Sequence, residues 1–292
     1  MTDQTSALLR GAYDLHVHCA PDVIPRAQDL LELAEEASMA GMAGVLIKDH
    51  TSSTVGRAYA LNRLYPQGPR FLSALVLNPP VGALNSFAVE AALRQGVDVV
   101  YLPTYAAKHQ IDVLGPDGFA PAFPRPEGFE GIAVLDQAHE VDAELLAILD
   151  LIARHDAVLA TGHISTQEIL DLLRAAQWYG IRRVLVTHAS HAVPAMSISE
   201  QRQAVTYGAF IEHCLMPTIK RGPGAIPVEV IRDQVRAVGA EHVILSSDLG
   251  QADNGPVVAG FARCLERLIE AGLTEDEVRV MIADSPAKLL FG

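Results

Sequence analysis

The chain contains few cysteines, a single tryptophan and little charge. It has 292 residues, of which three are cysteine, one is tryptophan and 20% are charged. Cys19, Cys214 and Cys264 are an odd number without metal-type spacing, which argues against a disulfide framework and indicates reduced thiols. No apolar run approaches the ~20 residues of a membrane span, and the first residues lack the pattern of a signal peptide. We therefore expect a cytoplasmic protein without a membrane partner.

Apolar residues and negative charge are what the chain has in abundance. Half of the residues (50%) are hydrophobic and the formal net charge is −13. The negative charge argues against binding to nucleic acid or to an anionic membrane surface. The length is near the ~250 residues of one (β/α)8 barrel, although a rule based on length alone suggests two domains. We expect one barrel domain over residues 1–292.

Short runs rich in Val, Ile and Leu alternate with amphipathic helical stretches. The predicted strands cover 13–18, 44–48, 71–77, 97–102, 157–160, 183–186, 209–213 and 243–248. The predicted helices cover 27–40, 55–64, 89–95, 141–153, 199–207, 228–238, 261–270 and 275–283, with one more opened by a capping box at 165–168. Continuous apolar strands suit a parallel sheet buried on both faces. The pattern favours an α/β fold, a closed (β/α)8 TIM barrel; an open doubly wound sheet is the weaker alternative, because no Gly-rich phosphate loop follows an early strand.

The stretch 104–131 interrupts this rhythm. It contains four prolines, Pro116, Pro121, Pro124 and Pro126. Loops of this length in compact domains are usually functional or disordered. We expect an inserted loop or small hairpin that acts as a lid over a site, or else packs against a neighbouring subunit in a possible homo-oligomer.

Two histidines end the first predicted strand, in Tyr13-Asp14-Leu15-His16-Val17-His18. Successive side chains of a strand point to opposite faces, so His16 and His18 point the same way. Their imidazoles can then hold one metal ion. Taken alone, the pair is equally compatible with chance.

Further polar residues follow other predicted strands. Lys48 and His50 come after the second strand, His163 after the fifth, His188 after the sixth and Asp248 after the eighth. In a (β/α)8 barrel these strand ends meet on the face that carries active sites. A lone buried histidine is usually structural, but so many at the same end of several strands are hard to assign to chance. Imidazole and carboxylate suit a catalytic Zn²⁺ or a related divalent ion.

These residues make the sequence resemble the amidohydrolase superfamily of metal-dependent hydrolases. The closing segment 285–292, Ser-Pro-Ala-Lys-Leu-Leu-Phe-Gly, is similar to the Asn-Pro-Ala ending of many members, and the resemblance spans nearly the whole chain. It implies a metal held by His16, His18, His163, His188 and Asp248. It also implies that Asp248 takes the proton from the attacking water and later delivers it to the leaving group. A histidine not used as a ligand, such as His188, can stabilise the developing oxyanion.

One feature departs from the family's pattern. Many binuclear members bridge two metals with a carboxylated lysine or a glutamate after strand four, whereas this chain has Tyr101-Leu102-Pro103-Thr104 there. Lys48 can be carboxylated and bridge, or remain cationic and bind a substrate anion; we favour the second. Glu212 is another possible carboxylate, but only Glu212 or its neighbour His213 can face inward. The number of bound ions remains open. A single ion would be held by His16, His18, Asp248 and either His163 or His188; two ions are equally compatible with the sequence.

The prediction for function is hydrolysis of a C–N or C–O bond in a cyclic amide, amide or lactone. Lys48, Arg26 and His50 are the predicted substrate-binding residues, and the two cations indicate a small anionic metabolite. Zinc is the expected divalent metal, with Mn, Ni or Fe as alternatives. The other functions left open are a mononuclear metal-dependent decarboxylase, a phosphoesterase and a catalytically idle barrel that serves as a scaffold.

Overall fold

The structure is a computed structural model that describes residues 7–115, 127–135, 141–221 and 224–292. It divides into two compact units. The first comprises Met1–Lys48, Thr54–Ser73 and Glu212–Gly292, and the second Asp49–Ser53 and Ala74–Ile211. The chain passes from one unit to the other after Lys48, after Ser53, and within the third and seventh strands.

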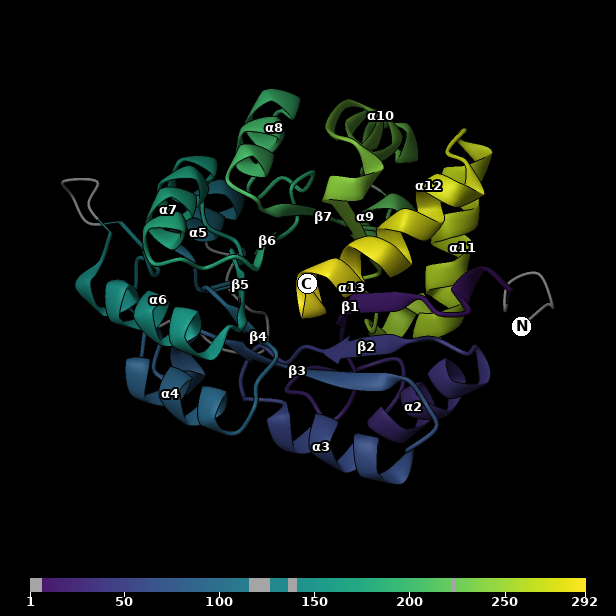
Figure 1. Ribbon diagram of the computed structural model, residues 1–292, viewed down its shortest axis with the longest axis horizontal. Coiled ribbons are helices and arrows are strands. Elements are labelled where there is room, and N and C mark those ends of the chain that lie inside the picture. Colours follow the sequence, from purple (N-terminus) through teal and green to yellow (C-terminus); the bar gives the residue numbers. More distant parts are fainter. Residues whose placement is uncertain (1–6, 116–126, 136–140, 222–223) are drawn as a thin grey trace. The chain divides into compact units, whose positions relative to one another are not determined.

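Eight parallel strands follow one another in sequence order in one sheet (Figure 1). They are β1 (Tyr13–Val17), β2 (Gly44–Ile47), β3 (Arg70–Val76), β4 (Val99–Tyr101), β5 (Val158–Ala160), β6 (Val184–Val186), β7 (Phe210–Cys214) and β8 (Val243–Ser246). In the first unit, β8 is bonded on both sides: Leu215 N–H donates to Ser246 O and Asp248 N–H to His16 O, each at 2.9 Å. This arrangement of eight parallel strands with intervening helices is the predicted (β/α)8 barrel, which is confirmed.

Helices connect the strands, as the alternating pattern predicts. They are α2 (Leu30–Met39), α3 (Val55–Leu64), α4 (Ser86–Arg94), α5 (Lys108–Leu114), α6 (Ala143–His155), α7 (Thr166–Trp178), α8 (Ile198–Thr206), α9 (Met216–Ile219), α10 (Val228–Val238), α11 (Val257–Glu270), α12 (Glu275–Arg279) and α13 (Ser285–Phe291). Among the described residues, none of these helices is long and apolar enough to cross a membrane.

Capping residues determine where several helices begin. The Asp29 side chain accepts hydrogen bonds from the N–H groups of Leu31 and Glu32, and the Glu32 side chain accepts one from the Asp29 N–H. Because of this capping box, α2 begins at Leu30 rather than at the predicted residue 27. The capping box predicted at Ser165 and Glu168 is present at the start of α7. These side chains satisfy N–H groups that the helix itself leaves without a partner.

The predicted loop 104–131 contains a helix, which the sequence analysis missed. Helix α5 occupies Lys108–Leu114, and residues 116–126, which hold the four prolines, lie outside the described part. Ile111 packs with Tyr105 and Ala106 in a small apolar cluster that Phe129 and Ile132 cover. Burial of Ile111 in this cluster stabilises a helix that is too short to form alone. The lid function of the stretch stays a prediction.

The C-terminal helices of the first unit extend further than predicted. The expected helix 275–283 continues through a π-helical turn (Val280–Asp284) into α13. Pro286 is tolerated because it lies in the first turn of α13. At the other end of α13, the Phe291 ring lies 6.4 Å from the Tyr13 ring, which ties this helix to β1.

Candidate metal centre

His16 and His18 present the same ring nitrogen to one carboxylate in the first unit. The Nδ1 atom of His18 lies 2.9 Å from the Lys48 carbonyl, and the Nδ1 atom of His16 lies 3.3 Å from Glu212 Oε2. Acceptors at Nδ1 place the proton of each neutral ring there and leave Nε2 with its lone pair. The two Nε2 atoms lie 3.5 Å (His16) and 3.3 Å (His18) from Asp248 Oδ1.

These separations fit a bound divalent cation. Ligands at Zn–N and Zn–O lengths of ~2.0–2.1 Å in a tetrahedron stand about 3.4 Å apart. The ligand atoms of His16, Cys214 and Asp248 also lie within 4.8 Å of one another. Neutral imidazole, carboxylate and thiolate are donors that suit zinc and related ions. The first unit therefore has a donor set that can hold a metal.

Glu212 adds a second carboxylate to this cluster. The residue is 0% exposed, and its Oε1 atom has no hydrogen-bond partner in the described part of the chain. A buried carboxylate oxygen without a partner is costly unless a cation or donor offsets it. The sequence left open whether Glu212 or His213 faces inward; Glu212 contacts His16, and strand alternation turns its neighbour to the other face.

Burial shapes the protonation of the cluster. It lowers the pKa of His18 to about 4, against the opposing effect of Asp248, and so favours the neutral ring that a metal requires. Burial also lowers the pKa of Lys48, whose Nζ lies 2.9 Å from His16 Nε2. It raises the pKa of the Cys214 thiol well above its usual value. Cys214 therefore remains a neutral thiol unless a cation at the cluster stabilises the thiolate.

A buried carboxyl lies beneath the strand ends of β1 and β8. Asp14 Oδ1 accepts the N–H groups of Ser247 at 2.9 Å and of His16 at 3.3 Å. Burial raises the pKa of Asp14 to about 7, although these hydrogen bonds oppose the shift. Asp14 thus fixes the backbone on either side of the candidate ligands His16 and Asp248.

Asp248 and His188 share an uncommon backbone conformation. Their φ angles are +54° and +58°, in the left-handed region that few non-glycine residues adopt. Such residues cluster at active sites, where the surrounding structure enforces a conformation that costs about 1–3 kcal/mol. In both cases the residue follows a strand, β8 or β6.

Arg26 is less available than the sequence indicates. Its Nη2 and Nε atoms lie 2.6 and 2.8 Å from Asp22 Oδ2, and both side chains are 2% exposed. Asp22 neutralises most of the charge that was expected to attract a substrate anion. Binding of substrate by Arg26 stays a prediction.

Two predicted ligands lie together in the second unit. The rings of His163 and His188 meet edge to face, with centroids 4.9 Å apart, and His191 lies 5.7 Å from His188. The Nδ1 atom of His163 contacts Gln110 Oε1 in a short hydrogen bond. With its proton donated to Gln110, the neutral His163 ring has its lone pair on Nε2, as a metal ligand requires.

The last predicted residue, His50, belongs to a polar network of the second unit. Its Nδ1 atom lies 3.0 Å from Thr104 Oγ1, which also contacts Asn78. The ring of Tyr105 lies edge-on to His50 at 5.8 Å. The structure thus gives His50 specific partners, which the sequence did not reveal.

Sequence reasoning missed Cys214, Gln110, Asn78 and Thr104. Only Cys214 has a sequence signal: it stands two residues after Glu212 in β7, so both point to the same face. Gln110 lies in the helix that was expected to be a loop. Asn78 and Thr104 follow β3 and β4, where ordinary turn residues are common.

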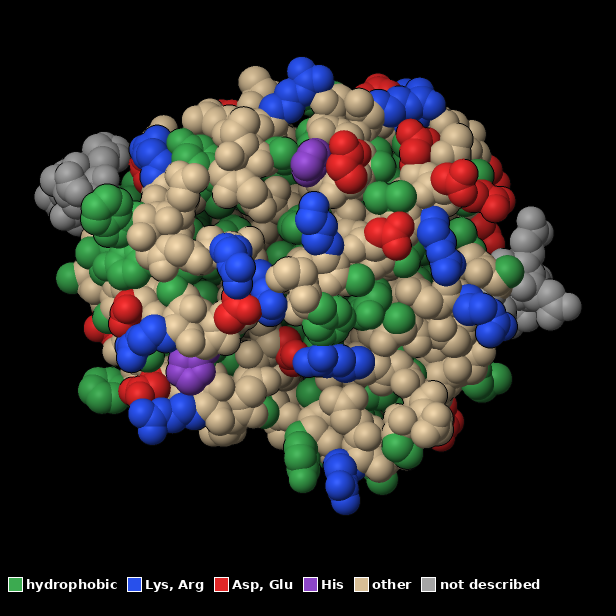
Figure 2. All heavy atoms as spheres, viewed as in Figure 1, with side chains coloured by type: hydrophobic (Ala, Val, Ile, Leu, Met, Phe, Trp, Pro, Cys, Tyr) green, Lys and Arg blue, Asp and Glu red, His purple; other side chains and the backbone are tan. Residues whose placement is uncertain are grey.

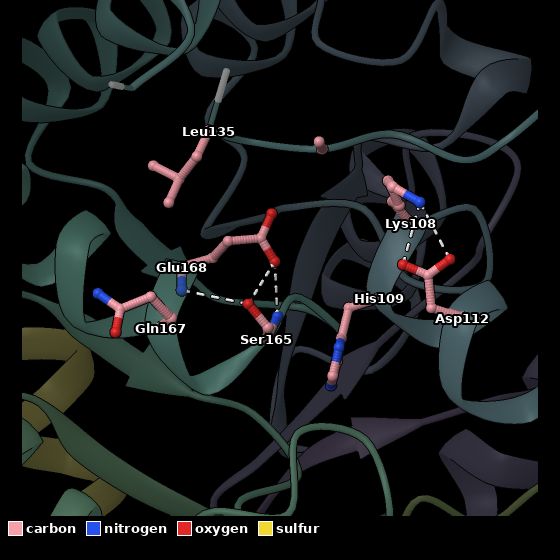
Figure 3. Close-up of a pocket in the computed structure, with 8 residues that line it drawn as sticks. Lys108, His109, Asp112, Leu135, Ser165, Gln167 and Glu168 are labelled. Carbon is pink, nitrogen blue, oxygen red and sulfur yellow. Dashed lines mark hydrogen bonds and ion pairs between the residues drawn. The ribbon is translucent and has the colours of Figure 1, made fainter. Parts of the chain in front are cut away.

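A hollow of about 240 Å³ opens between α5 and the start of α7 in the second unit (Figure 3). Its polar residues pair locally: Lys108 with Asp112, and Ser165 with Glu168. None of the predicted ligands lines it. It is therefore distinct from the candidate metal centre.

A larger hollow, of about 660 Å³, lies beside α11 and α12 of the first unit. Figure 2 shows acidic side chains gathered over these two helices. Four acidic residues line it, Glu266, Glu270, Glu275 and Asp276, together with the basic residue Arg279. Exposed carboxylates of this kind are common on solvated protein surfaces and do not by themselves indicate a binding site.

Solved structures define the class of fold. An amidohydrolase from Pseudomonas aeruginosa is 13% identical, with a TM-score of 0.66 over 99% of this chain and 98% of that one. An organophosphorus hydrolase from Deinococcus radiodurans is 14% identical, with 0.62 over 98% and 93%. A Pseudomonas putida protein assigned as a 2-pyrone-4,6-dicarboxylic acid hydrolase is 15% identical, with 0.60 over 96% and 97%. The chain thus has the (β/α)8 fold of amidohydrolase-type enzymes, which confirms the resemblance at the level of the fold.

The family follows from the sequence. The model of a family of unknown function, DUF6282, matches residues 11–212, more than half of the chain. The chain belongs to this family. No curated protein matches it. The matched region includes all the candidate histidines and ends before Asp248.

Proposed function

We propose that the protein is a metal-dependent hydrolase of the amidohydrolase type. The observation that carries this proposal is the approach of His16 Nε2 and His18 Nε2 to Asp248 Oδ1, at 3.5 and 3.3 Å. The fold adds support, because its structural neighbours include an amidohydrolase and an organophosphorus hydrolase. A scaffold protein has no need for buried imidazoles aimed at a carboxylate.

We assign His16, His18 and Asp248 as metal ligands, joined by His163 and His188. The last two follow β5 and β6, and in (β/α)8 folds the side chains after the strands build one active face. Zinc suits this donor set, although manganese, nickel and iron also accept imidazole and carboxylate. The number of ions, one or two, decides between a mononuclear and a binuclear centre.

The chemistry follows from the donor set. A divalent cation, when bound, lowers the pKa of water toward ~7 and polarises a substrate oxygen. Asp248 accepts the proton of the attacking water and delivers it to the leaving group; its side chain is 11% exposed and so remains within reach of solvent. His188, where it is not a ligand, stabilises negative charge on the substrate oxygen.

The proposed substrate is a small anionic metabolite with a cyclic amide, amide or lactone bond. Lys48, Arg26 and His50 are the proposed binding residues. The assignment of the Pseudomonas putida neighbour to a dicarboxylic acid hydrolase is in keeping with an anionic lactone. The buried thiols of Cys19, Cys214 and Cys264 form no disulfide, which supports a reducing compartment, for which we propose the cytoplasm. Assembly into a homo-oligomer stays a prediction.

A mononuclear decarboxylase is the second candidate. Strand β4 ends at Tyr101, and the residues directly after it, Leu102, Pro103 and Thr104, include no lysine or glutamate that can bridge two ions. Lys48 already contacts His16 Nε2, which favours a role beside a single ion. An amine at this place can bind the carboxylate that a decarboxylase removes.

Metal analysis by inductively coupled plasma mass spectrometry tests the proposal. Two ions per chain support the binuclear hydrolase and make carboxylated Lys48 the next target, to be sought as extra density in a crystal structure. One ion per chain supports a mononuclear centre and favours the decarboxylase as the function. If purified protein and protein reconstituted with Zn²⁺ or Mn²⁺ both lack metal, the proposal is wrong.

A further inference from the structure

We propose that Asn78 and Thr104 hold neutral His50 with its proton on Nε2, so that His50 is a hydrogen-bond donor to a substrate carboxylate or carbonyl oxygen. The inference rests on the proposed function, because it assigns a role within the same site. It makes His50 neither a metal ligand nor a proton acceptor. Asn78 and Thr104 are then positioning residues that act through His50.

The orientation of the Asn78 amide is the first step. Asn78 is 0% exposed, and its Oδ1 atom accepts the backbone N–H of Thr104 at 3.0 Å. In a flipped amide, the Asn78 NH₂ group would face the Thr104 N–H, and two donors cannot bond to each other. Nδ2 therefore lies on the side opposite to this N–H. This nitrogen donates one N–H to the His50 carbonyl at 3.1 Å and the other to Thr104 Oγ1 at 2.8 Å. Both amide hydrogens are therefore used.

The hydroxyl of Thr104 is the second step. Thr104 is 0% exposed, so its hydroxyl hydrogen needs a partner within the protein. Asn78 Nδ2 is a donor and cannot accept it. In the described part of the chain, the remaining contact of Thr104 Oγ1 is His50 Nδ1, at 3.0 Å. The hydroxyl thus donates to Nδ1, because the opposite direction would leave a buried O–H without an acceptor.

The tautomer of His50 follows from this accounting. A neutral imidazole that accepts at Nδ1 carries its proton on Nε2. A protonated Nε2 has no lone pair for a metal and none for a proton. It can only donate, and its natural acceptor in an anionic substrate is an oxygen of a carboxylate or carbonyl group.

The surroundings suit such a donor. His50 is only partly buried, whereas both residues that orient it are fully buried. Backbone and side-chain bonds from the ends of β3 and β4 converge on it, and the Tyr105 ring restricts its rotation from one edge. A donor held from several sides loses little freedom when it binds an oxygen.

Nuclear magnetic resonance of ¹⁵N-histidine-labelled protein, in its zinc-loaded and metal-free forms, tests the tautomer. The His50 signals are identified by their absence in His50→Gln. We expect long-range ¹H–¹⁵N correlations of the Nε2–H tautomer in the natural protein and in Thr104→Ser, which keeps the hydroxyl. Thr104→Val removes the donor to Nδ1, and part of the His50 population should move to the Nδ1–H form. An Nδ1–H tautomer in the natural protein overturns the inference.

Titration with acetate, followed on the same His50 signals, tests the donor role. We expect acetate to shift the Nε2–H resonance and to bind about tenfold more weakly to Thr104→Val than to Thr104→Ser. A resonance that ignores acetate, or equal affinities in the two variants, contradicts the proposal. Failure of the proposed function appears separately, as absence of bound metal in mass spectrometry, while the tautomer can be read in metal-free protein.

Discussion

The two units surround their histidines with different chemistry. In the first unit His16 contacts the carboxylates of Glu212 and Asp248 and the amine of Lys48. In the second unit the contacts at Nδ1 are with neutral groups: the amide of Gln110 for His163 and the hydroxyl of Thr104 for His50. Carboxylates supply the negative charge that holds a cation, whereas neutral groups set the tautomer and direction of a ring. Charged groups thus surround His16 in the first unit, whereas neutral groups orient His163 and His50 in the second.

The largest effect is expected when His16, in β1, and His18, which directly follows this strand, are both removed. We expect the double variant His16→Ala/His18→Ala to lose its metal while it remains folded, because both imidazole donors of the cluster in the first unit are gone. Mass spectrometry of bound metal and circular dichroism measure the two properties. His242→Ala, a histidine with a 39% exposed side chain in the same unit, is the control. If the double variant keeps its full metal content, His16 and His18 are not ligands.

Asp248→Asn tests whether the carboxylate also moves a proton. We expect turnover of any substrate to fall by about 10²–10⁴-fold, the usual contribution of a positioned acid or base. The exposed Asp253, in the turn after β8, provides the matched control Asp253→Asn. Steady-state kinetics at saturating metal separates this effect from weaker metal binding. Retained activity refutes the proton-transfer role.

Two variants, one in each unit, compare how much the partner at Nδ1 contributes to metal affinity. Glu212→Gln replaces the carboxylate at His16 Nδ1 with a neutral amide, and Gln110→Leu removes the acceptor at His163 Nδ1; changes of this kind typically reduce metal affinity 10–100-fold. We expect Glu212→Gln to have the larger effect, because it also removes a negative charge. Competition with a chelating dye measures both affinities, with the exposed Glu229→Gln as control. Unchanged affinity in Gln110→Leu would show that His163 is not a ligand.

The smallest effect concerns the backbone that carries the ligands. Gly250 has φ +126°, and a Cβ there would overlap the His18 carbonyl. We expect Gly250→Ala to lower the free energy of unfolding by about 2–4 kcal/mol. Gly255→Ala, at φ +70° with open space around it, should cost about 1 kcal/mol. Urea unfolding compares the two, and equal losses mean that the close approach at Gly250 is unimportant.

The strands were predictable because their apolar runs differ sharply from the amphipathic helices. The end of each strand was found to within a few residues, which placed His16, His18 and Asp248 at strand ends. Helix starts were less certain where a cap decided them, as at Asp29. Helix α5 was missed because its stability comes from contacts of Ile111 with residues on both sides of it in the chain.

Partners distant in sequence could not be predicted. His16 and Glu212 are 196 residues apart, and His163 and Gln110 are 53 apart. The pattern of apolar and polar residues predicts the face of a strand or helix on which a side chain lies. It does not predict which distant residue contacts that side chain. The pairing of β1 with β2 is irregular between Asp14 and Val17, which the sequence pattern also did not indicate.

The main chain joins the strand ends that bear His18, Lys48 and Asp248. The bonds are His18 N–H to Leu249 O, Lys48 N–H to Val17 O and Asp248 N–H to His16 O, at 2.8–2.9 Å. Such bonds do not depend on which side chains the residues carry. Evolution, or a protein engineer, can therefore exchange one ligand at a time and change the preferred ion while the frame stays in place.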